Sequence, residues 1–124
     1  MSIANWLETQ LLDKCFNAGS FAGVTTSYVK LHSSDPGEDC SSGAFGDTTR
    51  ATATFGAASG NMISNDADIT WTNLSAGGTI SHISVWDQSS GGNPYWYGAL
   101  TASKTVNSGD TFKILNGDLD ITLD

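Results

Sequence analysis

From Val24 onward, apolar and polar side chains alternate in short segments that are separated by Gly, Asn and Asp. The last segment shows the pattern most clearly, because Leu119, Ile121 and Leu123 fall on one side of an extended chain. The side chains of Asp118, Asp120, Thr122 and Asp124 fall on the other. A period of two residues is that of a strand in a sheet with one dry and one wet face. The pattern therefore predicts a mainly β fold.

The expected strands are short and recur at intervals of about eight to twelve residues, which is typical of an antiparallel β-sandwich of the jelly-roll type. Asn116-Gly117 is the strongest hairpin signal, and Ser90–Pro94 marks a longer turn. A length of 124 residues suits one domain. We expect a single sandwich domain over residues 1–124, with strands at Ser27–His32, Thr49–Phe55, Asn61–Ser64, Ala67–Thr72, Thr79–Trp86, Tyr95–Thr101, Lys104–Val106, Thr111–Leu115 and Leu119–Leu123.

A helical pattern covers residues 2–17, where apolar residues recur three and four apart: Ile3, Leu7, Leu11, Leu12, Cys15 and Phe16. Ser2 is the expected N-cap, and Gly19 lies where a helix usually stops. Four turns are marginal alone, so the helix must dock. We expect it to pack on the sheet of its own domain, with docking only on a partner as the alternative. Trp6 and Trp71 are expected in the core or at the helix contact.

Residues 33–47 are rich in Ser, Gly and acids, and we expect a long surface loop or an arm there. Asp35, Glu38 and Asp39 lack the spacing of a calcium-binding loop. Asp118 and Asp120 share a strand face but have no third ligand nearby in sequence. We expect solvated acids, no metal site and no cofactor, with a weak cation site as the alternative.

Thirteen acids and five bases give a formal net charge of −8. Such a surface repels phosphate backbones, so nucleic acid is not an expected partner. No apolar run approaches the ~18 residues that a membrane span requires, and the N-terminal residues lack a secretory signal pattern. We therefore expect synthesis in a reducing compartment. There Cys15 would be a buried helix thiol and Cys40 a loop thiol, with a disulfide as the alternative.

A Ser-His-Asp set can be assembled on paper from Ser81, His82 and either Asp87 or Asp110. The chain has no G-x-S-x-G turn to activate such a serine. The glycine-rich stretch at 56–61 lacks the Lys-Ser/Thr of a phosphate-binding loop. We expect His82 to be a hydrogen-bonded strand residue and the chain not to be an enzyme.

Trp86, Tyr95, Trp96 and Tyr97 concentrate on two strands that we expect to be adjacent. Alternation places Trp96 on the opposite face from Tyr95 and Tyr97. Three interpretations are open: core packing with cross-strand pairing, an anchor at a protein–protein contact, or a platform that stacks on sugar. These four aromatics are the candidate partner-contact residues.

Several short motifs follow one another along the chain. The opening reads S-I-x-N-x-L-E-x-x-L-L-D-x-x-F over 2–16, and Y-V-x-L-H-S-x-D-P-G-E follows at 28–38. T-F-G-A-A-S-G at 54–60, I-S-N at 63–65, Y-G-A-L-T at 97–101, G-D-T-F-K at 109–113 and G-D-L-D-I-T at 117–122 complete the series. In this order the motifs resemble a family of small virion proteins of tailed phages and prophages. Cys15 and Cys40 depart from it. The resemblance implies a virion structural component without enzymatic residues.

The leading hypothesis from size and resemblance is a capsid decoration or cement protein, made in the host cytoplasm and located on the capsid surface. It would bind the major capsid protein or other virion proteins as a homo-oligomer. Binding the assembled lattice but not loose subunits would stabilise the head by linkage. The alternative is a tail or tail-fibre component that contacts a host receptor, with the aromatic cluster stacked on surface glycan.

Overall fold

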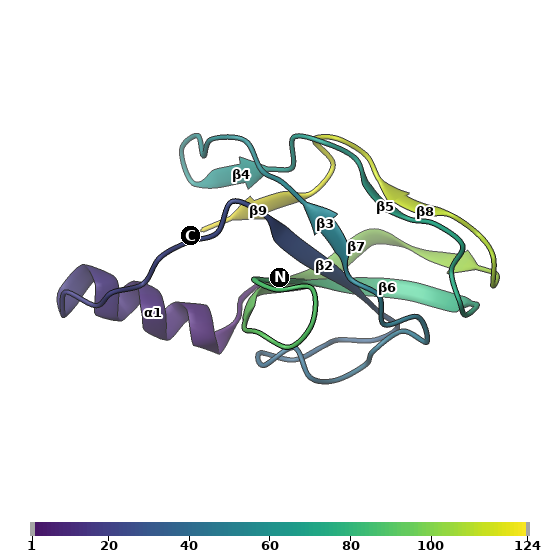
Figure 1. Ribbon diagram of the computed structural model, residues 1–124, viewed down its shortest axis with the longest axis horizontal. Coiled ribbons are helices and arrows are strands. Elements are labelled where there is room, and N and C mark those ends of the chain that lie inside the picture. Colours follow the sequence, from purple (N-terminus) through teal and green to yellow (C-terminus); the bar gives the residue numbers. More distant parts are fainter. Residues whose placement is uncertain (1, 124) are drawn as a thin grey trace.

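The computed structural model describes residues 2–123. Its centre is a five-stranded antiparallel sheet in the order β1-β7-β6-β2-β3 (Figure 1). The bounds of these strands are Ser2–Ile3 for β1, Ser27–His32 for β2, Ala51–Ala53 for β3, Gly78–Trp86 for β6 and Pro94–Val106 for β7. The mainly antiparallel β fold that alternation predicts is thus confirmed.

Two short antiparallel ladders complete the β structure. One pairs β4 (Met62–Ser64) with β9 (Asp120–Thr122), and the other pairs β5 (Ile69–Trp71) with β8 (Phe112–Ile114). They lie along one side of the larger sheet (Figure 1). Within residues 2–123 they do not join into a second continuous sheet, so the jelly-roll sandwich is not confirmed.

The hydrophobic core lies between the five-stranded sheet and the two ladders. Register places Val29 beside Val85, and Val85 beside Trp96, so three neighbouring strands turn apolar side chains to the same face. The ladders cover that face with the aromatic pair Trp71 and Phe112, whose ring centroids are 5.5 Å apart. Burial of side chains of this size contributes about 1.5–3 kcal/mol each. Trp71 therefore occupies the core, as expected.

The structure joins two strands that the sequence pattern separates. Tyr95–Thr101 and Lys104–Val106 are parts of one strand, β7, because β6 runs beside it along most of its length. The register shifts between Ile80 and His82, which is where a β-bulge absorbs the change of pairing. β2 has the predicted bounds. β3 and the four strands of the two ladders are shorter than predicted, whereas β6 begins one residue earlier.

The helix α1 spans Asn5–Phe16 and begins later than predicted. Ser2 is not its N-cap: Ser2 and Ile3 pair with Tyr97 and Trp96 as β1, and the cap position falls on Ala4 without a side-chain hydrogen bond. The backbone N–H of Ala4 instead donates to the carbonyl of Tyr95 at 2.9 Å. Ser2 and Ile3 therefore belong to the sheet, although the sequence pattern assigned them to the start of the helix.

α1 projects from the β body (Figure 1) and has no buried residues. Its first turn does dock, because Trp6 stacks on Tyr95 with ring centroids 5.7 Å apart and an interplanar angle of 4°. Beyond that turn the helix does not lie on its own sheet, and Phe16 is 84% exposed. The expectation of a helix packed on its own domain holds for the first turn and is wrong for the last.

The predicted loop at 33–47 is folded back on the sheet rather than extended as an arm. His32 and Ala44 form an antiparallel bridge, and Phe45 enters the core. Cys40 is buried in this loop while Cys15 is exposed on α1, which reverses the expected environments. Both thiols are free. The reversal follows from the projecting helix, which leaves Cys15 without a covering element.

Candidate functional site

The four candidate aromatics separate onto the two faces of the sheet, as alternation predicts. Trp96 is 3% exposed and belongs to the core, so its side chain faces the ladders. Tyr97 lies directly opposite Ser84 on the other face, which we call the outer face. Trp86 is also half-buried there, beside Tyr28 of β2. Whether any of these residues contacts a partner stays a prediction.

Trp86 is covered on one ring face by a cation. The guanidinium carbon of Arg50 lies 3.9 Å from the ring centroid. The same guanidinium donates from Nη1 to the carbonyls of Gln88 and Gly91, at 2.7 Å each. Burial lowers the pKa of Arg50, and the Asp87 carboxylate opposes that shift. Arg50 thereby fixes the 88–91 turn over the outer face.

A second aromatic group joins α1 to the sheet. Phe21 meets both Trp6 and Tyr95 edge-on, at centroid distances of 6.0 and 6.1 Å. Burial, followed by the nearby Asp87 carboxylate, raises the pKa of Tyr95. The helix-docking role expected of Trp6 is confirmed. Sequence reasoning missed the part played by Phe21, since an isolated aromatic in a polar linker carries no periodic signal.

An open groove lies at this end of the molecule, beside the helix. We call it the helix-end groove; its volume is about 710 Å³. Its walls come from α1, from the linker that follows it and from the β4–β9 ladder. The lining residues share one property, the absence of any charged side chain, and they include Leu7, Leu11, Phe21, Val24, Phe55, Met62, Ile121 and Leu123. The groove is therefore apolar in a chain of net charge −8.

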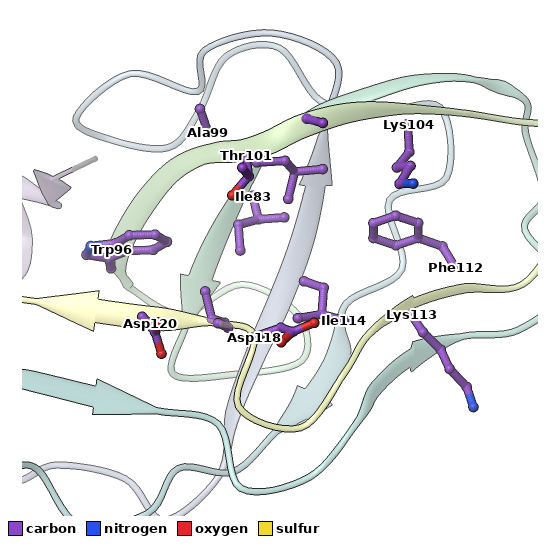
Figure 2. Close-up of a pocket in the computed structure, with 13 residues that line it drawn as sticks. Ile83, Trp96, Ala99, Thr101, Lys104, Phe112, Lys113, Ile114, Asp118 and Asp120 are labelled. Carbon is purple, nitrogen blue, oxygen red and sulfur yellow. The ribbon is translucent and has the colours of Figure 1, made fainter.

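Trp96 forms part of the groove wall, and among the described residues it alone has a buried side-chain polar atom without a hydrogen-bond partner. Its indole Nε1 is buried and has no hydrogen-bond partner within residues 2–123. Figure 2 shows this nitrogen at the end of the ring that points away from the other labelled side chains. An unsatisfied buried donor costs about 1–3 kcal/mol. Because this atom is buried, the fold itself bears that cost within residues 2–123.

A smaller hollow, of about 550 Å³, lies between β7 and the turn before β9. Figure 2 shows Phe112 and Ile114 on the ladder side of this hollow, with Lys113 directed away from it. Asp120 accepts a hydrogen bond from the hydroxyl of Ser64, and Lys113 lies 3.8 Å from the Asp68 carboxylate. Two of the charged groups at its edge, Asp120 and Lys113, therefore have partners in the fold.

Two of the acids singled out by sequence accept hydrogen bonds from nearby backbone amides. Asp35 accepts from the amide of Gly37, and Asp39 accepts from the amide and hydroxyl of Ser41. These bonds from Ser41 lower the pKa of Asp39. In the described range 2–123, no group of three His, Cys, Asp or Glu side chains is placed to hold a metal.

The Ser-His-Asp set considered from the sequence does not assemble in the structure. Ser81 contacts its neighbour His82, with Oγ and Nδ1 2.8 Å apart. Asp87 instead accepts from the backbone and side chain of Asn93, and Asp110 accepts from the amide of Asn107. Each carboxylate thus closes a turn. No helix in the stretch from 2 to 123 is long and apolar enough to cross a membrane.

Taken together, the compact antiparallel body, the projecting helix and the uncharged groove are the surface features that distinguish this chain. The comparison with protein families identifies the class of protein that has these features. The chain is a structural protein of the virion of a tailed phage. It belongs to the family described as Podophage GP4 fiber I protein gp80, whose model matches residues 2–122. No curated protein matches the chain.

Proposed function

We propose that this chain is a structural subunit of a tail fibre, which acts by contact with other proteins and carries out no catalysis. The observation that carries the proposal is the match to a fibre protein family over residues 2–122, almost the whole chain. The geometry supports it, because the β body has a hydrophobic core and most of the exposed large apolar side chains of the described residues lie on α1 or line the helix-end groove.

Capsid decoration is the other placement in the virion. The compact acidic domain suits a head-bound subunit as well, since net charge keeps a free subunit soluble before assembly. The family description names a fibre, and we therefore place the tail first. Partners in the tail placement are neighbouring fibre subunits and a host surface.

Immunogold electron microscopy of purified particles tests the placement. Antibody to this chain should label the tail region, and particles that lack the chain serve as the control. Label confined to the head would overturn the fibre assignment in favour of decoration. Absence of label from intact and opened particles alike would overturn both.

Receptor contact is a second function that one observation favours. Of the candidate partner-contact aromatics on the outer face, Trp86 is covered by Arg50 and Tyr95 by Trp6. No aromatic or cationic group within residues 2–123 stacks on Tyr97, which is half-buried and therefore keeps ring surface for a sugar. A stacked pair of aromatic rings contributes about 0.5–1.5 kcal/mol of binding free energy, and we use the same range for a sugar stacked on Tyr97.

Particles carrying Tyr97→Ala should therefore adsorb to host cells up to about tenfold more weakly. Leu115→Ala is the matched control, because Leu115 is an exposed apolar residue, 53% accessible, in another part of the fold. Equal adsorption by both variants and the parent would exclude the aromatic platform while leaving the fibre placement untouched.

A further inference from the structure

The segment 33–43 of the loop after β2, which we call the strap, is held at both of its ends. At its neck, the amide of Ser33 donates to the carbonyl of Gly43 at 2.8 Å. At its far end, the amide of Asn5, the first residue of α1, donates to the carbonyl of Glu38 at 3.1 Å. Figure 1 shows this loop on the side of the five-stranded sheet away from the two ladders. The strap therefore crosses the outer face from the end of β2 to the base of the helix.

A small buried cluster lies under the strap, separate from the main core. Its members are His32 from β2, Ser84 from β6, and Pro36 and Cys40 from the strap, and all four are buried. Leu31 faces the main core, so alternation turns His32 to the outer face. An antiparallel sheet commonly leaves such a face to water. Here the strap covers it and encloses a titratable ring.

The hydrogen bonds inside this cluster suit a neutral ring. Ser84 Oγ lies 2.7 Å from His32 Nε2 and 2.8 Å from Trp86 Nε1, and it has no other hydrogen-bond partner among residues 2–123. Trp86 only donates, so with a neutral ring the hydroxyl accepts from Trp86 and donates to His32. A protonated ring has no lone pair at Nε2. The hydroxyl proton of Ser84 would then be buried without an acceptor, which destabilises the closed strap.

The charged groups around His32 also oppose a positive charge on the ring. Lys30 lies two residues before it on the same face of β2, and His82 lies directly opposite it on β6. Both add repulsion, whereas the carbonyls of Ser42 and Gly43 favour the charged ring. Burial is the largest effect, and the pKa of His32 is lowered. The closed strap therefore favours the neutral form.

The strap supplies no carboxylate to compensate such a charge. Its three acids, Asp35, Glu38 and Asp39, are exposed, and within residues 2–123 none of them bonds to His32. The Cys40 thiol is neutral, because burial and then the Asp39 carboxylate raise its pKa to about 12. A proton on His32 would therefore add a buried charge without a counter-ion.

We propose that the strap is an acid-released cover, closed over the outer face at neutral pH and lifted when His32 takes up a proton. Lifting admits water to the imidazolium, exposes Cys40 and Ser84, and breaks the bond between Glu38 and the base of α1. The main core stays closed, because none of its buried members is ionisable. In the lifted state His32 is hydrated and titrates near its ordinary value of 6.5. The ratio of lifted to closed molecules should thus rise below pH 6.5 by at most about tenfold per pH unit.

Thiol labelling tests the lifting. The full chain is treated at pH 7 and at pH 5 with dithiodipyridine, which reacts with thiols in mild acid. Peptide mass spectrometry then gives the ratio of the initial labelling rates of Cys40 and Cys15. Because Cys15 is exposed on α1, the ratio cancels the pH dependence of the reagent. The ratio should rise by up to about thirtyfold at pH 5, and an unchanged ratio would overturn the proposal.

Two histidine variants separate this cover from a general effect of acid. His32→Gln cannot titrate, and its amide can still donate to the Ser42 carbonyl, so its labelling ratio should stay constant. His82→Gln removes the titratable group opposite His32 on β6 but leaves His32 in place. Its ratio should rise as in the parent. An equal rise in His32→Gln would show that another group releases the strap and would overturn the proposal.

A nuclear magnetic resonance titration of the parent gives a second test that needs no variant. The imidazole signals of His32 and the amide signals of the strap should move with one midpoint below pH 6.5. Hydrogen exchange should become faster at Asn5, whose amide donates to the strap, while the β2–β6 ladder stays protected. Equal acceleration in the ladder would indicate global unfolding and overturn the cover, as would a strap that stays unchanged while His32 titrates. The isolated chain is used, so the outcome does not depend on its place in the virion.

Discussion

His32 and Ser84 are joined across two neighbouring strands by a buried hydrogen bond, with 2.7 Å between Nε2 and Oγ. The other ring nitrogen, Nδ1, lies 2.9 Å from the carbonyl of Ser42. A carbonyl only accepts, so Nδ1 carries a proton, and in the neutral imidazole Nε2 accepts from the Ser84 hydroxyl. Trp86 Nε1 donates to the same hydroxyl at 2.8 Å. This chain of bonds ties the 33–47 loop to β6, and burial of the ring favours its neutral form.

The neutral imidazole makes stability depend on pH. Burial lowers the pKa of His32 from its ordinary value of 6.5. The unfolded chain therefore binds the proton first, and stability is lost as the pH falls from about 6.5 towards the lowered folded pKa. We expect urea midpoints to fall between pH 7 and pH 5. His32→Gln should be less stable at pH 7 by about 1–3 kcal/mol and should lose most of this dependence.

His82→Gln is the matched control, because among residues 2–123 the His82 side chain bonds only to the hydroxyl of the adjacent Ser81. It should retain the fall in stability between pH 7 and pH 5. A parent protein with equal midpoints at the two pH values would contradict the assignment of a neutral His32.

Asp47 should contribute strongly to stability from a loop. Its Oδ1 accepts from the amide of Thr49 and its Oδ2 from the amide of Ser75, at 2.9 Å each. Burial alone would raise its pKa, but these bonds outweigh burial and lower it. Asp47→Ala leaves two amides without a partner and should cost about 2–4 kcal/mol of unfolding free energy.

Thermal unfolding of this variant should be compared with Asp13→Ala, the loss of an exposed acid on α1. Because the folded pKa of Asp47 is lowered, the difference should be full above the unfolded value near pH 4 and should shrink as the pH falls below it. Equal melting temperatures for the two variants would contradict the role of Asp47.

Gly43 and Gly60 offer a matched test of close packing. Their φ angles are +63° and +62°, so alanine at either position bears the same backbone strain. A Cβ at Gly43 would clash with the side chain of Ser34 and lie 2.8 Å from its carbonyl oxygen, whereas one at Gly60 would meet nothing. Gly43→Ala should therefore be less stable than Gly60→Ala by about 1–3 kcal/mol. Similar denaturation midpoints would show that the 33–47 loop is looser than described.

The two thiols should differ in reactivity. Burial, followed by the Asp39 carboxylate, raises the pKa of Cys40 to about 12, and its exposure is 1%. Cys15 is exposed on α1. Because the thiolate is the reactive form, native protein treated with iodoacetamide at pH 8 should gain a single adduct at Cys15. Mass spectrometry of tryptic peptides reads the site. An adduct at Cys40 without denaturant would contradict the burial of this loop.

Local pattern determined much of this protein. Two-residue alternation sent Trp96 to the core face and Tyr97 to the outer face, as found. It also gave the bounds of β2. These predictions succeeded because the side-chain direction in a strand depends only on the residue's place in the pleat. The order of short motifs pointed to a tailed-phage virion protein, which the family match bears out.

Tertiary structure alone decided where the helix begins and what it leaves uncovered. Ser2 has the side chain of an N-cap, but its backbone pairs with Tyr97, because a sheet edge offered hydrogen bonds that the capping rule does not consider. The apolar spacing of α1 predicts a buried face, yet Leu12 and Phe16 lie in solvent. Periodicity shows that a helix has an apolar face; which surface covers that face depends on contacts between distant segments or between separate chains.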